Sequence, residues 1–185
     1  MNLNDWIDRF ADYLRAEKNS SDHTVVHYRK DLLQFADYMK QQQIATFGAV
    51  SYLFVRSYLA RLNADEYAKR SVSRKLSALR TFYAYLQREG HIADNPFAAV
   101  KTPKQDKKLP GFLYVEEMLE LLAAPDRSTP AGKRDAAILE TLYASGMRVG
   151  ELVGLDVSGV DLHNGIALVF GKGAKERYVP LGEHA

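Results

Sequence analysis

The chain is 185 residues long and 46% hydrophobic, which suits a soluble globular protein with one good core or two small ones. It has no cysteine, which excludes disulfides, thiolate metal ligands and cysteine nucleophiles, and no apolar run of about 18 residues, which excludes a membrane span. The net charge of +2 is uneven: residues 1–103 hold 15 Lys and Arg against 11 Asp and Glu, whereas residues 111–185 hold 7 against 11. A basic first part favours a polyanion partner, and a solvated surface of uneven charge is the alternative.

Four amphipathic helices are predicted in the first half, each from apolar residues spaced three or four positions apart. Their expected ranges are Leu3 to about Lys18, about 24–42, about 50–62 and about 70–89. Oxygens of Ser20, Ser21 and Asp22 are expected to cap the second helix. The four apolar stripes can pack against one another, so this half is predicted to be a compact all-helical bundle.

The fourth predicted helix carries the clearest functional signal. From Lys69 to Arg88 it has six basic residues and no acidic one. Arginines and small hydroxyls share the face opposite its apolar stripe: Arg70, Arg74, Ser77, Thr81 and Arg88. Such side chains suit phosphates and guanine in a DNA groove. The helix has no internal ion pairs, which are worth about 0.2–0.5 kcal/mol each, and its basic residues repel one another. A bound polyanion would relieve this repulsion. The alternative is an ordinary solvated helix face.

A weaker second surface is predicted on the second helix, where three polar residues lie away from the apolar stripe: His27, Lys30 and Gln34.

The chain is predicted to divide into two domains near Pro103. Proline at positions 96 and 103, followed by a basic stretch that ends in Pro-Gly, predicts a first domain at 1–102, a basic linker at 103–111 and a second domain at 112–185.

The second domain is predicted to be α+β, which makes the whole chain mainly α. A helix is expected to begin within Leu113–Leu119, with Glu116 and Glu117 in its first turn as capping groups. Two more helices and two strands of a hairpin follow at 132–145, 149–155, Ile166–Phe170 and Arg177–Val179.

Three residues of this domain are candidates for chemistry. Arg148 follows Gly146 at a helix start, where free backbone N–H groups favour an anion and a guanidinium can hold a phosphate. Glu151 can reach back to orient that guanidinium or cap the helix. Lys172 lies between two glycines, so a ligand can approach it closely. The alternatives are a surface ion pair, worth about 0–1 kcal/mol, and a solvated lysine in a turn.

Two other kinds of site are rejected. Gly171-Lys172-Gly173 lacks the spacer and the Ser or Thr of a phosphate-binding P-loop. His23 and His27 are four residues apart but lack the glutamate of a zinc-binding helix. Neither a P-loop nor a zinc site is therefore expected.

Four blocks together resemble the Xer branch of the tyrosine site-specific recombinase (phage integrase) family, over essentially the whole chain. Residues 73–83 resemble that family's last core-binding helix, and residues 95–110 resemble its linker between domains. Ser145–Leu152 resembles the block with the first catalytic arginine, and Gly171–Gly182 resembles the hairpin with the catalytic lysine. Met147 and Gly150 depart from the residues expected there, Leu and Ser, without touching the chemistry.

The resemblance implies a SAM-like core-binding domain followed by the first part of a catalytic domain. It implies DNA strand exchange without a metal or a cofactor, through a 3′-phosphotyrosyl intermediate. In that reaction Arg148 would bind the non-bridging phosphate oxygens, Lys172 would protonate the leaving 5′-oxygen, and Glu151 would position Arg148. The implied partners are double-stranded DNA with a short, partly palindromic site and a related recombinase subunit in a tetramer, with no membrane. The implied role is chromosome dimer resolution at cell division, in the cytoplasm near the nucleoid.

The family also needs a later His-x-x-Arg element and a nucleophilic tyrosine. Neither is found in the 13 residues after Lys172, and Tyr178 is too close to Lys172 to match the nucleophile. We therefore expect these 185 residues to bind DNA without cleaving it. The alternatives are a non-catalytic DNA-binding accessory module and a mobile-element integrase; a helical protein-binding scaffold would leave the acid-free helix unexplained.

Overall fold

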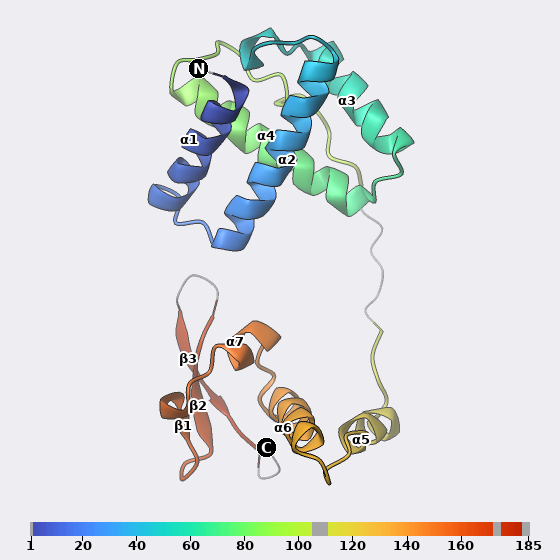
Figure 1. Ribbon diagram of the computed structural model, residues 1–185, viewed down its shortest axis with the longest axis vertical. Coiled ribbons are helices and arrows are strands. Elements are labelled where there is room, and N and C mark those ends of the chain that lie inside the picture. Colours follow the sequence, from blue (N-terminus) through green and yellow to red (C-terminus); the bar gives the residue numbers. More distant parts are fainter. Residues whose placement is uncertain (1, 105–110, 172–174, 183–185) are drawn as a thin grey trace. The chain divides into compact units, whose positions relative to one another are not determined.

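The computed structural model describes residues 2–104, 111–171 and 175–182 of the chain. The chain divides into two compact units, Met1–Lys107 and Lys108–Ala185 (Figure 1). Each unit has its own hydrophobic core. Among the described residues, no helix is long and apolar enough to cross a membrane, and no three acidic or histidine side chains gather in a way that could hold a metal ion.

The first unit contains the four predicted helices, each within two residues of the expected start. They are α1 (Leu3–Ala16), α2 (Asp22–Gln41), α3 (Tyr52–Ala64) and α4 (Lys69–Arg88), with a short 3₁₀ turn, η1 (Phe47–Ala49), before α3. Side-chain oxygens cap the N-termini of three of these helices. Asn2 and Asp5 form a reciprocal capping box on α1, Ser21 caps α2 as expected, and Ser51 caps α3.

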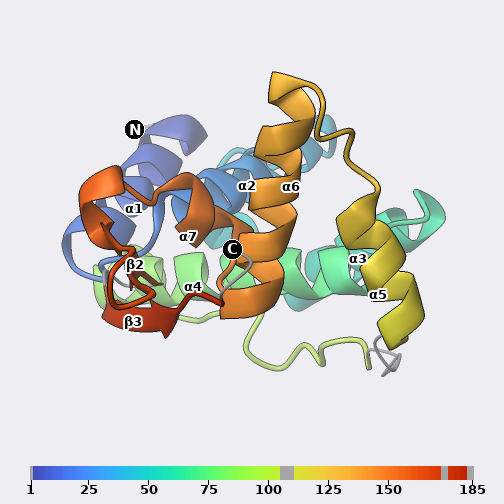
Figure 2. The same ribbon diagram turned by 90° about the horizontal axis from the view of Figure 1, so that it is seen from below.

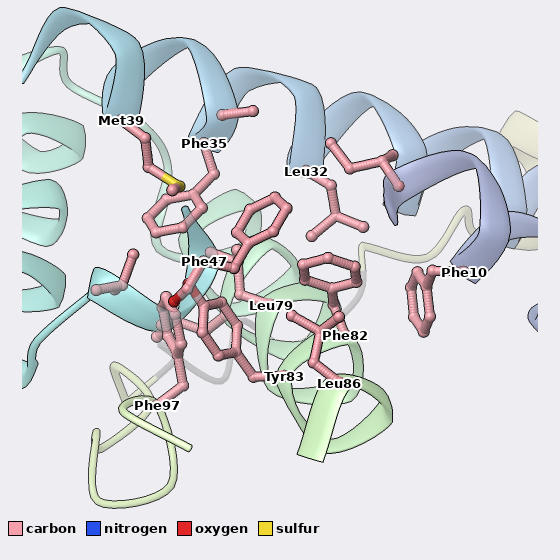
Figure 3. Close-up of a cluster of buried hydrophobic side chains, with 14 of the residues drawn as sticks. Phe10, Leu32, Phe35, Met39, Phe47, Leu79, Phe82, Tyr83, Leu86 and Phe97 are labelled. Atoms are coloured by element: carbon pink, nitrogen blue, oxygen red, sulfur yellow. The ribbon is translucent and has the colours of Figure 1, made fainter. Parts of the chain in front are cut away.

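The core of the first unit is largely aromatic. The ring of Phe35, on α2, is fully buried and lies 4.9 Å from Tyr58 and 5.6 Å from Phe97, both in edge-on geometry. Figure 3 shows Phe97 entering this cluster from the segment that follows α4, close to Tyr83. The Tyr83 hydroxyl donates a hydrogen bond to the Phe47 carbonyl at 3.2 Å. The segment after α4 is therefore packed as part of the first unit.

In residues 111–171 and 175–182, the second unit has three helices and a small antiparallel sheet. Its elements are α5 (Val115–Ala123), α6 (Pro130–Ser145), α7 (Val149–Val153), the 3₁₀ turn η2 (Val157–Gly159), β1 (Val160–Asp161), β2 (Ile166–Phe170) and β3 (Glu176–Pro180). The strand order is β1-β2-β3, and α7 lies between α6 and the strands (Figure 2). The mainly helical fold class with a hairpin is confirmed; β1 and the 3₁₀ turns were not predicted.

The register of the hairpin decides which side chains of β3 point inward. Val169 of β2 pairs with Arg177 of β3, and Ala167 pairs with Val179. Ala167, Val169 and Val179 are buried, whereas Tyr178 is 69% exposed. Because successive residues of a strand face opposite sides, Arg177 shares the inner face with Val179.

Candidate functional site

Arg148 lies where α6 ends and α7 begins. Gly146 closes α6 in the left-handed conformation, with φ at 62°, which glycine adopts without strain. The next residue, Met147, is buried in the small core. Arg148 is then the N-cap residue of α7, and its side chain is 72% exposed. The buried Met147 thus anchors the backbone at this helix boundary, while the Arg148 side chain extends into solvent.

Glu151 is the buried centre of this site. Its side chain is only 4% exposed, yet both carboxylate oxygens are hydrogen-bonded. Arg148 donates its backbone N–H at 2.7 Å and its Nη1 at 2.9 Å. Arg177 donates Nη1 and Nη2 in a bidentate pair, at 2.6 and 2.8 Å. One carboxylate therefore joins α7 to β3 and fixes the base of the Arg148 side chain.

The electrostatics keep this carboxylate ionised. Hydrogen bonds from Arg177, and then from the Arg148 backbone, lower the pKa of Glu151 to about 2. Arg177 was given no role in the sequence analysis. Arg177 is two residues before Val179 in β3, so the two side chains face the same side; this spacing is the signal that could have placed Arg177 on the inner face.

Acid should weaken the second unit in a defined pH window. The folded-state pKa of Glu151 lies below the value of about 4.3 for a free glutamate, so its contribution to stability is complete above that pH. The contribution should disappear progressively as the pH falls from about 4.3 towards 2. Hydrogen exchange of the β2 and β3 amides should accelerate in this window, beyond the intrinsic pH effect on exchange. Glu151→Gln should remove the extra acceleration; an unchanged profile in that variant would contradict the assignment.

Lys172 lies outside the described residues, so its placement stays a prediction. The residues on either side are joined by a hydrogen bond of 2.7 Å from the Gly171 N–H to the Lys175 carbonyl. Gly171 also lies against the carboxylate site, because a Cβ there would come within 3.3 Å of Arg177 Nη1 and 3.4 Å of Glu151 Oε1. A glycine at this position leaves room for the ion pair.

The residues predicted to contact DNA lie on or next to α4, but their surroundings differ. Arg70, Ser77 and Lys30 are exposed. Thr81 is half-buried, and its hydroxyl donates a hydrogen bond of 2.8 Å to the Ser77 carbonyl. Arg88 is exposed as well, so the structure leaves four of the six predicted side chains exposed.

Arg74 and Arg88 overturn one premise of the sequence analysis. The charges of α4 are not left to repel one another, because neighbouring segments supply the acids. Arg74 bonds to Asp31 of α2. Arg88 pairs with Glu17 at 3.0 Å and Glu89 at 2.8 Å, and its guanidinium lies 4.3 Å from the Tyr13 ring centroid. The need for a polyanion is weaker than the sequence of α4 alone indicated.

Asp31 also neutralises a buried lysine. Asp31 is 1% exposed, and Lys75 Nζ donates to its Oδ1 at 3.0 Å from a side chain that is 6% exposed. Lys75 also donates to Gln34, which in turn donates to the Tyr67 hydroxyl at 2.8 Å.

The expectation that Gln34 belongs to an outward surface with His27 and Lys30 is therefore wrong, because the Gln34 amide is hydrogen-bonded to Lys75 and Tyr67. Asp31 precedes Leu32 within the apolar stripe of α2, and that position was the available signal.

Comparisons with known proteins find relatives of both units of the chain. Residues 7–90 match the model of the phage integrase N-terminal SAM-like domain, and residues 111–185 match that of the phage integrase family. The chain is 54% identical to a tyrosine recombinase XerC of Halalkalibacterium halodurans, over 97% of this chain and 59% of the relative. It is 42% identical to the XerC of Bacillus subtilis, over 100% of this chain and 60% of the relative. The chain thus spans about three fifths of the length of these curated relatives.

The fold is similar to that of a lambda integrase solved as a tetramer bound to a Holliday junction. The TM-score is 0.73 at 22% identity, over 100% of this chain and 52% of the integrase. A second lambda integrase structure, a dimer bound to a core site, gives 0.71 over 97% of this chain and 49% of that one. With both domain models matched in order and XerC relatives aligned along nearly its whole length, the chain belongs to the phage integrase family of tyrosine recombinases, and within it to the Xer type.

Proposed function

We propose that this chain forms the DNA-binding and phosphate-binding part of an Xer-type recombinase that cuts and rejoins DNA. The observation that carries the proposal is the exposed guanidinium of Arg148, which the buried and ionised Glu151 holds through Nη1 and the backbone N–H. A preoriented cation on a rigid support is what a scissile phosphate requires, because charge builds on its oxygens in the transition state.

The resemblance to the tyrosine recombinase family implies a role for each site residue. Arg148 would bind the non-bridging phosphate oxygens, and Glu151 with Arg177 would hold it in place. Lys172 would protonate the leaving 5′-oxygen as a general acid. The attack itself would come from a tyrosine that forms a 3′-phosphotyrosyl bond. Because the 185 residues contain no match to that tyrosine or to His-x-x-Arg, we propose that they bind DNA without cleaving it.

The proposed substrate is double-stranded DNA with a short, partly palindromic site, bound by four subunits of two related kinds. The XerC names of the relatives and the tetrameric lambda integrase on a junction support this assembly. Resolution of chromosome dimers, in the cytoplasm near the nucleoid, is the proposed cellular role. No step of this chemistry needs a metal or another cofactor.

A chimaera tests the proposal directly. The 185 residues would be joined to the part of the Halalkalibacterium halodurans relative that follows the matched region. On a nicked suicide substrate, the chimaera should form a covalent protein–DNA adduct, visible on a denaturing gel, whereas the 185 residues alone should form none. An adduct with the 185 residues alone would overturn the assignment of the missing nucleophile. A chimaera that folds and binds the site but forms no adduct would overturn the proposed catalytic role.

Arg74 should contribute one phosphate contact to DNA binding by the 185 residues. Lys75 still neutralises Asp31 when Arg74 turns to a phosphate, so the contact leaves no buried charge unpaired. Arg74→Ala should lower affinity and reduce the slope of log K against log salt by about 0.9. Fluorescence anisotropy with a candidate half-site and its scrambled version would measure both. Arg61→Ala, which removes an equally charged side chain from α3, should leave the slope unchanged, and an equal loss in the two variants would refute the contact.

A further inference from the structure

The chain does not leave the first unit where α4 ends. Gly90 turns the backbone with φ at 74°, and the His91 N–H closes the helix on the Leu86 carbonyl at 2.9 Å. The following segment returns along α4 and is anchored by two apolar side chains, Phe97 at 0% and Val100 at 7% exposure. The point at which the chain leaves the first unit therefore depends on this returning segment.

Arg80 holds the returning segment at three points. Its Nε donates to the Phe97 carbonyl at 3.3 Å, its Nη2 donates to the Val100 carbonyl, and its Nη1 donates to the Thr102 hydroxyl at 2.8 Å. The segment also bonds to the backbone of Arg80, because Asn95 Nδ2 donates to the Arg80 carbonyl at 3.4 Å. All three guanidinium nitrogens thus bind one stretch of six residues, and none of them bonds to an acid in the part of the chain that the structure describes.

The location of these contacts fixes where the connector starts. Arg80 lies eight residues before the end of α4, which places it about 12 Å back along the helix axis. Thr102 is the last of the anchored residues, so the chain leaves the first unit beside the body of α4 rather than from the helix end.

We propose that Arg80 is a positioning residue that shortens the connector between the two units and so keeps the second unit close to the DNA bound by the first. This inference rests on the proposed DNA binding. With Thr102 held, 12 residues (103–114) precede α5; with Val100 and Thr102 released but Phe97 still buried, 17 residues (98–114) do so. Since effective concentration falls roughly as the −3/2 power of tether length, this release should cost about 1.7-fold in affinity for a site that both units contact.

The variant of choice is Arg80→Lys, because lysine keeps the charge but cannot serve three separated acceptors. Its matched control is Arg61→Lys, on the exposed side of α3, where the arginine pairs only with Asp65 among the described residues. Neither change alters the net charge that DNA meets, so any difference between them reports the contacts of Arg80.

Limited trypsin digestion of the 185-residue chain is the first readout. Lys101 lies between two anchored residues, and loss of their hydrogen bonds should raise cleavage after it by about tenfold in Arg80→Lys. Cleavage after Arg61, within α3, should not change. Unchanged cleavage after Lys101, or an equal rise at both positions, would show that Arg80 does not act on the segment specifically.

DNA affinity is the second readout. Arg80→Lys should bind a half-site about 1.7-fold more weakly than Arg61→Lys, and an Arg80→Lys variant that binds as tightly as Arg61→Lys would overturn the positioning role. If the unaltered chain binds no DNA, the proposed function fails, and the consequence for affinity fails with it. The trypsin result still decides whether Arg80 anchors the segment, so the two failures are distinguishable.

Discussion

Asp31→Ala is expected to destabilise the first unit by about 3–5 kcal/mol. The substitution leaves Lys75 buried at 6% exposure without its carboxylate partner, and a buried charge without a counter-ion is far costlier than a lost surface pair. Gln34 alone cannot neutralise it, because an amide carries no charge. The effect should exceed that of any single exposed ion pair in the unit.

Urea unfolding followed by tryptophan fluorescence would measure this loss. Trp6 is the single tryptophan of the chain and lies in α1, so its signal reports the first unit alone. The double variant Asp31→Ala/Lys75→Met should recover much of the stability, because it removes both charges and keeps an apolar side chain of similar length. A double variant no more stable than Asp31→Ala would show that the cost arises from lost packing and not from the unpaired charge.

Arg148→Ala is expected to reduce the rate of adduct formation by the chimaera about a hundred- to a thousandfold. The guanidinium is the group that meets the developing phosphate charge, and alanine leaves nothing in its place. Arg148→Lys should recover only part of the rate, because an ammonium cannot bind two oxygens in a planar bidentate pair. Single-turnover cleavage of the suicide substrate gives these rates.

The matched control for Arg148 is Arg134→Ala. Arg134 is a comparably exposed arginine, at 69%, and it pairs with Asp135 on α6. Its loss should leave both DNA binding and cleavage unchanged. DNA binding should also survive Arg148→Ala, because Glu151 keeps its bidentate partner Arg177. A parallel fall of binding and cleavage in Arg148→Ala would assign the arginine to affinity and not to chemistry.

Local patterns were sufficient to predict most of the secondary structure. The apolar stripes of α1–α4 gave their starts within two residues, and β2 coincides with the predicted strand. Strand β1 has only two residues, too few for an alternation to appear. The pairing of Arg148 with Glu151 was accessible for the same reason, since residues three apart on one helical turn are neighbours.

Contacts between distant segments could not be predicted in this way. Arg177 is 26 residues from Glu151, and Lys75 is 44 residues from Asp31, so each pair depends on how whole elements pack. The charge pattern of α4 misled for this reason: it counted acids on the helix itself, whereas the partners of Arg74 and Arg88 lie mainly on other elements. The role of Lys172 stays a prediction.

The register of the β2–β3 hairpin also limits how this protein can vary between species. Insertions or deletions that preserve the pairing of Val169 with Arg177 keep Val179 inside and Arg177 on Glu151. A shift of β3 by one residue would turn Tyr178 inward and Arg177 outward, and so remove the core side chain and the ion pair together. Changes in length within β3 should therefore be purged by selection, because they would remove both of these contacts at once.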